Sequence, residues 1–431
     1  MDKWGQCLIM AIIDNMTCLQ DINNTKDIKE MSPAIYPGMH CPLYGVGLVT
    51  PYIKEFAVLV VGTAECTYYS KSRLFKSNPE YAFTNVCNYV MEDSDVVFGC
   101  EKKIKDAVVK TYEQTGCKFI FLVTTCVPEL TGEYYQNIIS QVHKEFGITV
   151  LLVKLNRFNG ESHTEGMIEV LSSLAEIMEP VKKNNTKKTV NILGYRFDSF
   201  EESELASILS SNDILVNAVV PQICTVSSIK NAAGADINIV TDVMALKLAK
   251  QMKKLFGTEY IYFGKYLNPE YTKSSYEKLF SLLDLPLPDE VEEKYKVILE
   301  KIEGVKDRFK SKKVIYSGSI TLPFDTCLFL HRLGFEIQVI KLRTIFEPDF
   351  EFLNKLKETG INPYVCKSAN MNFMDEIYEH IKPDIVVGHD YPDRLEKYNI
   401  RMVLLNNASE ELGFSIIERS IDDLISDGGD L

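Results

Sequence analysis

Two matching segments decide the fold of this chain: Phe56-Ala57-Val58-Leu59-Val60-Val61-Gly62-Thr63-Ala64-Glu65-Cys66 and Phe119-Ile120-Phe121-Leu122-Val123-Thr124-Thr125-Cys126. Each begins with an apolar run that suits one buried strand and continues through small polar residues to a cysteine. Pro128 and Glu129 follow the second cysteine and suit the first turn of a helix. If both strands belong to one parallel sheet, both cysteines lie at its carboxyl edge, where α/β folds bind their ligands.

A third cysteine precedes these strands, in the segment Cys41-Pro42-Leu43-Tyr44-Gly45-Val46-Gly47. A helix N-terminus favours the thiolate form, and converging thiolates in a reducing compartment indicate a metal or iron–sulfur site. The neighbouring glycines fit a bulky cluster, because only glycine lets the backbone come so close. They fit ordinary tight turns equally well. These glycines are Gly45, Gly47 and Gly62.

The composition is that of an ordinary globular protein with two or three domains. The chain has 431 residues, of which 46% are hydrophobic and 25% are charged. Its net charge is −13 and it has no long basic stretch, which argues against nucleic acid or an anionic membrane as the main partner. Eleven cysteines without the short spacings of a disulfide framework favour a reducing cytoplasm.

The N-terminal region predicts neither a signal peptide nor a membrane span. The apolar run from Cys7 to Ile13 is short, stops at Asp14 and has no basic flank or small-residue cleavage site. No apolar run of the sequence is long enough to cross a bilayer. We therefore expect a cytoplasmic protein.

Apolar runs alternate with amphipathic segments along the chain, which predicts an α/β fold with three Rossmann-like domains, each a mostly parallel sheet flanked by helices. The predicted domains are 1–180, which carries the three cysteines, 190–288 and 312–431. A polar linker at 181–188 and a charged helix at 289–310 connect them. The predicted strands are 56–62, 95–98, 118–124, 148–154, 190–194, 214–219, 236–240, 259–263, 313–318, 335–341, 363–366, 384–388 and 401–405. The other predicted helices are 101–115, 128–146, 164–179, 201–210, 225–233, 243–256, 271–283, 323–333, 349–359 and 372–381.

The part of the chain from residue 40 to about 170 resembles the nitrogenase component 1 family. Cys41, Cys66 and Cys126 match that family's three cluster-binding cysteines in order and approximate spacing. The supporting motifs are Gly62-Thr63-Ala64-Glu65-Cys66, Val97-Phe98-Gly99, Thr124-Thr125-Cys126 with Glu129 and Gly132, and Phe158-Asn159-Gly160-Glu161-Ser162-His163. The last motif is similar to a segment of the β-type subunits, so within the family the chain resembles the β-type subunit of the molybdenum-iron protein.

This resemblance implies that Cys41, Cys66 and Cys126 bind an iron–sulfur cluster of the [4Fe-4S] or [8Fe-7S] kind, shared at a subunit interface. Three thiolates are too few to complete such a cluster. A homologous component 1 subunit, identical or different, would supply the remaining ligands in a dimer or tetramer.

Other residues are weaker candidates for the same cluster. Cys100 follows the strand predicted at 95–98, and Ser162 lies where β-type subunits carry a serine near the cluster, with a loop hydrogen bond as the favoured alternative for Ser162. The roles of Cys7, Cys18 and Cys224 stay open, because cysteine often behaves as a small buried hydrophobe.

Ligands for the family's second, large cofactor are missing from the sequence. Cofactor-bearing subunits have a cysteine after a middle-domain strand, where this chain has Thr241 and Asp242, and a histidine near the C-terminus, where it has 406–409 without histidine. His389 closes a predicted strand and could line a central cleft or serve as a loop residue. The sequence also lacks a Walker-type phosphate loop and a zinc motif.

The resemblance leaves three functions open. The first is an oxidoreductase subunit that accepts electrons from an ATP-dependent iron–sulfur reductase, with the catalytic site on a partner subunit. The second is a scaffold for assembly of a complex iron–sulfur or molybdenum–iron cofactor. The third is a subunit of a nitrogenase-like tetrapyrrole reductase. The missing cofactor ligands argue against dinitrogen chemistry on this subunit, and no catalytic residue is predicted.

Overall fold

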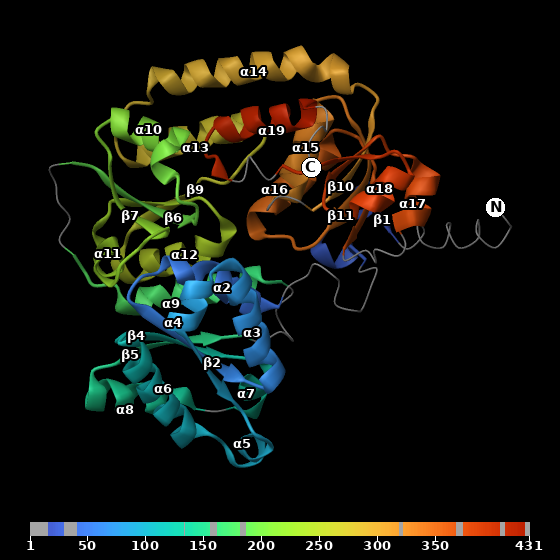
Figure 1. Ribbon diagram of the computed structural model, residues 1–431. Helices are drawn as coiled ribbons and strands as arrows, with labels where there is room; N and C mark the ends of the chain where they lie inside the picture. The colour runs from blue at the N-terminus through green and yellow to red at the C-terminus, as the bar shows by residue number, and fades with distance from the viewer. Residues whose placement is uncertain are drawn as a thin grey trace. The chain divides into compact units, whose positions relative to one another are not determined.

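Three mostly parallel sheets flanked by helices make up the protein (Figure 1), which confirms the predicted fold class. The computed structural model describes residues 16–29, 41–132, 134–155, 162–181, 187–318, 322–367, 374–405 and 410–426. Apart from a short edge strand at 17–18 in the third sheet, the chain begins each sheet at an inner strand, adds strands on one side and then crosses to the other side. This topology creates a switch point between two neighbouring strands, and α/β proteins bind ligands outside the carboxyl ends of such strands.

The first sheet has the strand order β3-β2-β4-β5, and all its pairs are parallel. Its strands are β2 (Phe56–Gly62), β3 (Val86–Val90), β4 (Phe119–Thr124) and β5 (Thr149–Lys154). Its helices are α2 (Pro42–Val49), α3 (Ala64–Ser77), α4 (Pro79–Thr84), α5 (Asp93–Phe98), α6 (Glu101–Thr115), α7 (Cys126–Thr131), α8 (Tyr135–Phe146) and α9 (Thr164–Ser173). The switch point therefore lies between β2 and β4.

Two predictions for this sheet are wrong. The strand predicted at 95–98 is the helix α5, because Glu92 and Asp95 form a capping box that starts a helix and Gly99, at φ 82°, ends it. The strand is β3 instead, whose central Asn88 interrupts the apolar pattern of a buried strand. The helix predicted at 128–146 is divided, since Gly132, at φ 74°, ends α7 before α8 begins.

β2 is buried along its whole length and separates two hydrophobic cores. Phe56 and Val58 pack into one core, while Ala57 and Leu59 pack into the other, as the two-residue period of a strand requires. The first of these cores continues to Leu248 of the second sheet region. The first two sheets therefore share one core.

The second sheet has the order β7-β6-β8-β9 and is parallel throughout. Its strands are β6 (Thr189–Tyr195), β7 (Leu215–Pro221), β8 (Ile237–Val240) and β9 (Glu259–Tyr262), and α11 (Val226–Asn231) and α12 (Leu246–Phe256) pack beside them. The switch point lies between β6 and β8. There the buried Asn191 donates a hydrogen bond of 2.8 Å to Asn238, which ties the two strands together.

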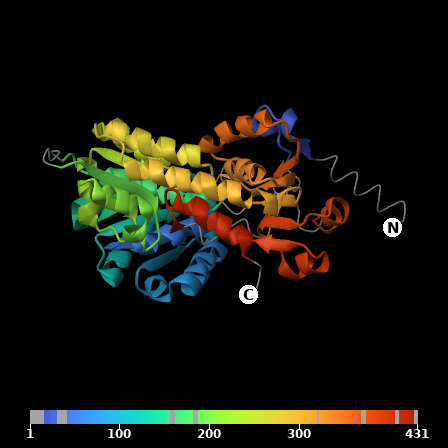
Figure 2. The same ribbon diagram turned by 90° about the horizontal axis from the view of Figure 1, so that it is seen from above.

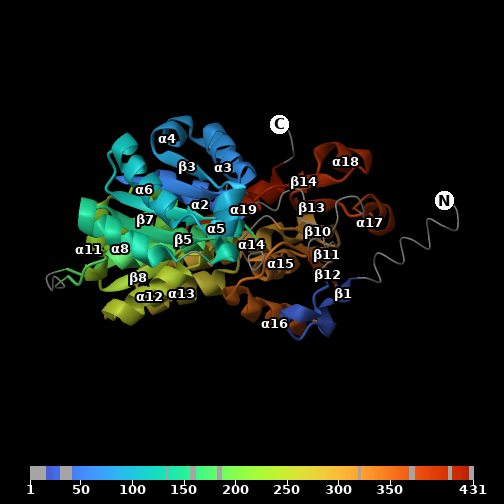
Figure 3. The same cartoon turned by 90° about the horizontal axis from the view of Figure 1, so that it is seen from below.

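The third sheet has the order β1-β12-β11-β10-β13-β14, which Figure 3 shows from below. Only the edge strand β1 is antiparallel among its described pairs. The strands are β1 (Thr17–Cys18), β10 (Lys313–Ser317), β11 (Glu336–Leu342), β12 (Tyr364–Lys367), β13 (Ile385–Gly388) and β14 (Arg401–Val403). The helices of this unit are α10 (Glu204–Ser211), α13 (Pro269–Leu282), α14 (Asp289–Phe309), α15 (Pro323–Arg332), α16 (Phe350–Glu358), α17 (Met374–Ile381), α18 (Pro392–Lys397) and α19 (Ser415–Ile425).

The long helix α14 runs beside α19 in this unit (Figure 2). Lys301 of α14 contacts Glu418 at 3.1 Å and Asp422 at 2.8 Å across the two helices. Across the described ranges, no helix has the length and apolar character that a membrane span needs.

The chain forms two compact units. Gly38–Asp198 and Asp213–Tyr262 contain the first two sheets, whereas Met1–Pro37, Ser199–Asn212 and Phe263–Leu431 contain the third. The number of sheets equals the number of predicted domains. The predicted boundaries at 1–180, 190–288 and 312–431 stay a prediction.

Candidate functional site

Cys66 and Cys126 lie at the switch point of the first sheet. Its strands β2 and β4 are neighbours, with Val61 opposite Thr124. Cys66 is the third residue of α3, which follows β2, and Cys126 is the first residue of α7, which follows β4. Both cysteines therefore stand in the first turn of a helix at the carboxyl edge expected from the sequence.

A glycine brings the starts of these two helices together. The Thr125 N–H donates to Val61 O at 3.0 Å, and a Cβ added to Gly62 would lie 2.2 Å from Thr125 Oγ1. Only glycine therefore fits at position 62 without displacing Thr125. The Thr125 hydroxyl is buried, and Oγ1 has no hydrogen-bond partner among the described residues.

Cys41 begins a third helix at this site, because it is the N-cap of α2. α2 contacts α3, and it crosses α9 at a very short distance. A Cβ on Gly45 would lie 1.8 Å from His163 O, and a Cβ on Gly166 would lie 1.9 Å from Pro42 O. The two glycines thus let the backbones touch, and this contact fixes the position of the turn that carries Cys41.

Ser162 lies at the start of α9, next to this crossing. It is buried, and its Oγ accepts a hydrogen bond of 3.3 Å from the Thr164 N–H. The adjacent His163 ring meets Tyr44 of α2 edge-on at 5.8 Å. Ser162 is therefore close to the helix that Cys41 begins, and it also makes the local loop hydrogen bond that is its alternative explanation.

Exposure separates the three candidate ligands from the core cysteines. Cys41, Cys66 and Cys126 are partly exposed, as are Cys18, Cys87 and Cys117, whereas Cys100, Cys224, Cys327 and Cys366 are buried. Burial raises the pKa of Cys224 and of Cys366 to about 12. Thiols of that kind stay protonated and make poor metal ligands.

Cys100 does not close a strand, contrary to the sequence prediction. It is the N-cap of α6, which follows α5, and it packs into the core that contains Ala57 and Leu59. Its burial disfavours ligation, although a role near the cluster stays a prediction. Cys18 pairs with Tyr364 in the third sheet, and Cys7 lies outside the described residues.

The chemistry of the three thiols suits an iron–sulfur cluster. Among the described residues, no three His, Cys, Asp or Glu side chains gather closely enough to hold one ion. In a cluster each thiolate binds its own iron, so the thiols stand further apart. Thiolates are also the soft ligands that such clusters prefer, and Gly45 and Gly62 provide the close backbone packing around the thiols.

The edges of the other two sheets carry no equivalent thiol or imidazole ligand set among the described residues. Thr241 closes β8 and donates to Leu193 O at 3.3 Å, while Asp242 accepts a 3.1 Å hydrogen bond from the Met244 N–H and caps a short helix. His389 follows β13, and its carbonyl accepts a 2.8 Å hydrogen bond from the Ser317 hydroxyl. Burial and the nearby cations Arg343 and Lys341 lower the His389 pKa. The segment 406–409 lies outside the described residues.

An exposed apolar surface next to the cysteines was not predicted. Phe98 at the end of α5 is 86% exposed, and α5 contacts α7. We name this group the α5–α7 apolar surface; its residues are Val96, Val97, Phe98 and Leu130. The signal in the sequence was the run Val96-Val97-Phe98 directly after a capping box, which places apolar residues on a helix too short to bury them.

Asp95 holds α5 in place beneath this surface. Its buried carboxylate accepts hydrogen bonds from the Tyr89 hydroxyl at 2.7 Å, the Lys103 ammonium at 2.6 Å and the Glu92 N–H at 2.9 Å. Burial alone would raise the pKa of Asp95, but these hydrogen bonds lower it below its usual value. These hydrogen bonds therefore hold α5 in a defined position at the carboxyl edge of the first sheet.

Comparison with known proteins gives a consistent result. The family described as "Nitrogenase component 1 type Oxidoreductase" matches residues 41–408. The nitrogenase iron-molybdenum cofactor biosynthesis protein NifE of Clostridium pasteurianum is 26% identical over 358 residues, which cover 81% of this chain and 77% of that protein. The nitrogenase molybdenum-iron protein alpha chain of the same organism is 28% identical over 249 residues, which cover 56% and 46%.

Two further matches bear on the fold and the relatives. One subunit of the light-independent protochlorophyllide reductase from Porphyra purpurea is 29% identical over 192 residues, 42% of this chain and 38% of that protein. The solved structure "Nitrogenase Cp1 at pH 6.5" has a TM-score of 0.78 at 16% identity and covers 94% of both chains, which supports the fold. The specific likeness to the β-type subunit stays a prediction.

Proposed function

The chain belongs to the nitrogenase component 1 type oxidoreductases, and from this premise we propose that it is the subunit of a nitrogenase-like enzyme that holds part of an iron–sulfur cluster at an interface with a partner subunit. One observation supports the proposal: Cys41 is the N-cap of α2, and Cys66 and Cys126 stand in the first turns of α3 and α7, where they flank the switch point of one parallel sheet.

The chain's own residues would bind and orient this group. Cys41, Cys66 and Cys126 would ligate it as thiolates, and the N-termini of α2, α3 and α7 would stabilise their negative charge. Gly45 and Gly166 would hold Cys41 in register by fixing α2 against α9. When bound, the cluster supplies one-electron transfer.

Two partners complete the proposal. A homologous subunit would supply the remaining cluster ligands, because three thiolates leave iron positions open. An ATP-dependent iron–sulfur reductase would deliver electrons. The α5–α7 apolar surface supports docking by a protein, since exposed aromatic and apolar residues that are held rigidly are typical of interfaces. Reduced thiols in this number fit the cytoplasm.

Substrate reduction itself is assigned to the partner subunit. The Thr241 hydroxyl and the Asp242 carboxylate are engaged in local hydrogen bonds at the edge of the second sheet, and the His389 main-chain carbonyl accepts one at the edge of the third. Thr241 and Asp242 are weak ligands for a large iron-containing cofactor compared with a cysteine.

Anaerobic purification tests the proposal. We expect bound iron and sulfide, a reducible electron paramagnetic resonance signal, and reduction of the cluster that requires both ATP and a reductase of this family. A chain with a full cluster that such a reductase cannot reduce, with or without a homologous subunit, would contradict the electron-transfer role.

A scaffold role is the second candidate function, and one observation favours it. The NifE protein of Clostridium pasteurianum, named as a cofactor biosynthesis protein, aligns with 81% of this chain. A scaffold would release its cluster to an acceptor protein and reduce no substrate. Incubation of the iron-57-labelled chain with an acceptor apoprotein separates the two roles, because an electron-transfer subunit keeps its label.

A tetrapyrrole reductase subunit is the third candidate. The relative that suggests it covers 42% of this chain, so it supports the role for that part of the chain. Reduction of a tetrapyrrole by the purified complex would decide for it.

A further inference from the structure

The hydroxyl of Thr125 is a buried polar group without a partner in the described part of the chain. The side chain is 3% exposed, and Oγ1 forms no hydrogen bond with any described residue. A buried hydroxyl without a hydrogen bond destabilises a fold, so its presence requires a specific explanation. Thr125 stands directly before Cys126, one of the three proposed cluster ligands. A group bound at this site is therefore the first candidate for its partner.

The second sheet has a threonine at the equivalent position, and there the hydroxyl is satisfied. Across the first switch point the Thr125 N–H donates to Val61 O at 3.0 Å. Across the second, the Thr241 N–H donates to Leu193 O at 2.8 Å, and the Thr241 hydroxyl donates to the same oxygen at 3.3 Å. The Thr125 hydroxyl makes no such bond to Val61. The local backbone arrangement therefore does not by itself leave this hydroxyl without a partner.

Gly62 shows on which face of the sheet the Thr125 hydroxyl lies. A Cβ added to Gly62 would lie 2.2 Å from Oγ1, so the hydroxyl occupies the space that a side chain at this position would fill. Alternate residues of a strand face the same side, so this space is on the side that Val60 faces. Cys41 and Cys66 pack against the core on that side. The hydroxyl therefore lies on the same face as two of the proposed ligands.

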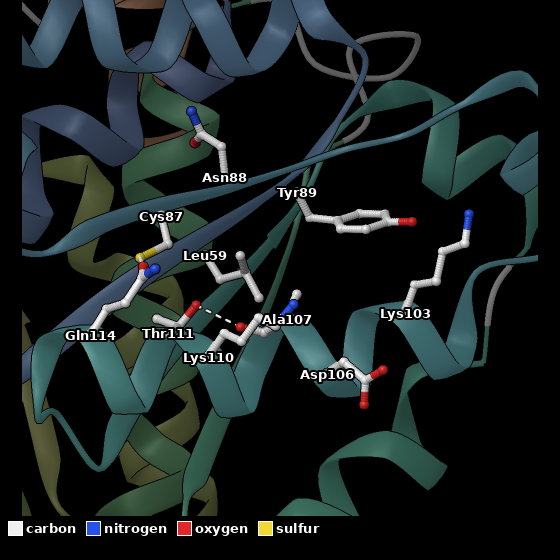
Figure 4. A pocket seen from close by; sticks show the side chains of 10 residues that line it. All are labelled: Leu59, Cys87, Asn88, Tyr89, Lys103, Asp106, Ala107, Lys110, Thr111 and Gln114. Carbon is white, nitrogen blue, oxygen red and sulfur yellow. Dashed lines mark hydrogen bonds between the residues drawn. The ribbon is translucent and has the colours of Figure 1, made fainter.

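The other face of the first sheet is used differently. There Leu59 and Tyr89 line a groove of about 370 Å³ between β3 and α6 (Figure 4). None of the three proposed ligand cysteines lines this groove. The hydroxyl and the candidate cluster site are thus separate from it.

We propose that the Thr125 hydroxyl donates a hydrogen bond to a sulfur atom of the cluster held by Cys41, Cys66 and Cys126, and thereby raises the reduction potential of that cluster. This inference rests on the proposed function. Reduction adds negative charge to the cluster, and a hydrogen bond to sulfur stabilises that charge. The reduced state therefore gains more from the hydroxyl than the oxidised state does.

Two substitutions at position 125 separate the hydroxyl from the shape of the side chain. Thr125→Val keeps the branched shape and removes the hydroxyl, whereas Thr125→Ser keeps the hydroxyl. Thr258→Val is the matched control, because the Thr258 hydroxyl is also buried and has no partner among the described residues. Thr258 directly precedes β9, so it stands at the amino edge of the second sheet, away from the cysteines.

Anaerobic redox titration followed by electron paramagnetic resonance measures the reduction potential, and iron per chain measures the cluster content. Thr125→Val should hold as much iron as the unmodified chain. Its reduction should be disfavoured by about 10-fold, which is a shift of about 59 mV to more negative potential for one electron. Thr125→Ser and Thr258→Val should keep the original potential. Equal potentials in Thr125→Val and Thr258→Val, with full clusters in both, would overturn the inference.

The exchangeable proton of the hydroxyl gives a second readout. Electron-nuclear double resonance of the reduced cluster, prepared in H₂O and in D₂O, detects exchangeable protons that are coupled to the cluster. Thr125→Val should lose one such coupling, and Thr125→Ser should retain it. Identical spectra for the unmodified chain and Thr125→Val would contradict the proposed hydrogen bond.

The same measurements separate a failure of this inference from a failure of the proposed function. If the unmodified chain binds no cluster, both fail, because the hydroxyl then has no sulfur to bind. If the cluster is bound but is transferred to an acceptor protein, the electron-transfer role fails, while a shifted potential in Thr125→Val still supports the inference. If the cluster accepts electrons from the reductase and Thr125→Val leaves its potential unchanged, the inference alone fails.

Discussion

The same position of the fold is used in two different ways in the first and the third sheet. In these two sheets a helix follows the inner strands β2 and β10, and the third residue of that helix is Cys66 in α3 and Asp325 in α15. Cys66 is partly exposed, whereas Asp325 is completely buried. The Asp325 carboxylate accepts hydrogen bonds from the Leu267 N–H at 2.7 Å and from Asn268 Nδ2 at 2.6 Å.

This difference shows that topology determines where a functional side chain can stand but not what it does there. The carboxylate of Asp325 is used for structure: its hydrogen bonds attach residues 267 and 268 to the start of α15 at the edge of the third sheet. The thiol of Cys66 leaves its edge open. The following predictions test this contrast, beginning with the largest expected effect.

Removing a candidate thiol should abolish cluster binding. Each of Cys41→Ala, Cys66→Ala and Cys126→Ala should lose most of the bound iron and the visible charge-transfer absorption, because the three thiols are the proposed ligands. Iron per chain and the visible spectrum of anaerobically prepared protein measure the effect. Far-UV circular dichroism should stay unchanged.

Cys87→Ala is the matched control for these variants. Cys87 is also a partly exposed thiol of the first sheet, but it lies within β3 and donates a hydrogen bond to Gln114 of α6. Its iron content should equal that of the unmodified chain. Full iron in all three ligand variants would refute the assignment.

Asp325 should make the protein less stable as the pH rises. Burial raises the pKa of Asp325 to about 7 from an ordinary value of 3.8. A raised pKa means that the folded chain binds the proton more tightly, so stability is complete below pH 3.8 and declines as the pH rises toward 7. Between these two pH values the contribution of Asp325 to the free energy of unfolding should fall by about 4 kcal/mol. Urea unfolding of the unmodified chain and Asp325→Asn between these pH values measures it, and the difference between the two proteins should change with pH.

Asp95 in the first sheet region provides a control of the opposite sign. Its hydrogen bonds to Lys103 and its neighbours lower its pKa, so it stabilises the fold at neutral pH and loses that contribution as the pH falls through the folded value. Asp95→Asn should therefore be most destabilising at neutral pH. If the loss of stability changed with pH in the same direction for Asp325→Asn and Asp95→Asn, this assignment would be wrong.

Gly45→Ala should weaken the packing that positions Cys41. The added Cβ would lie 1.8 Å from His163 O, a backbone atom that cannot rotate away. Overpacking of this kind costs about 1–3 kcal/mol, so the melting temperature should fall. Gly304→Ala in α14 is the matched control: its Cβ meets nothing within 4 Å, and it should stabilise the helix by about 0.5–1 kcal/mol. A Gly45→Ala chain as stable as the Gly304→Ala chain would exclude the close crossing.

The sequence predicts the strands β2 and β4 and the edge that carries Cys66 and Cys126, because buried strands followed by polar turns leave a local pattern. It misses β3, whose Asn88 interrupts that pattern and points away from α6 (Figure 4). It places Cys100 at a strand end, since the apolar residues of α5 look like a strand until the capping box at Glu92 is recognised.

Long-range contacts were also beyond the local pattern. The segment 16–29 looks unpatterned, yet Gln20 Nε2 donates to Lys357 O and Ile361 O at 2.9 Å, and β1 closes the edge of β12. A two-residue strand that depends on a partner about 340 residues away has no periodicity of its own. The exposure of Phe98 was likewise decided by which helices reach α5, which only the fold shows.

The smallest effect should come from placing a thiol at the carboxyl edge of the second sheet. Asp242 follows β8 at the switch point between β6 and β8, as Cys126 follows β4 in the first sheet. Here, among the described residues, the strand ends carry no set of thiol or imidazole ligands for a new thiol to join. Asp242→Cys should therefore bind no additional iron. The variant should lose the hydrogen bond that the Asp242 carboxylate accepts from the Met244 N–H. This loss should lower the free energy of unfolding by about 1 kcal/mol, which urea unfolding measures. Additional iron in this variant would show that topology alone creates a cluster site, and would remove the contrast between the sheets.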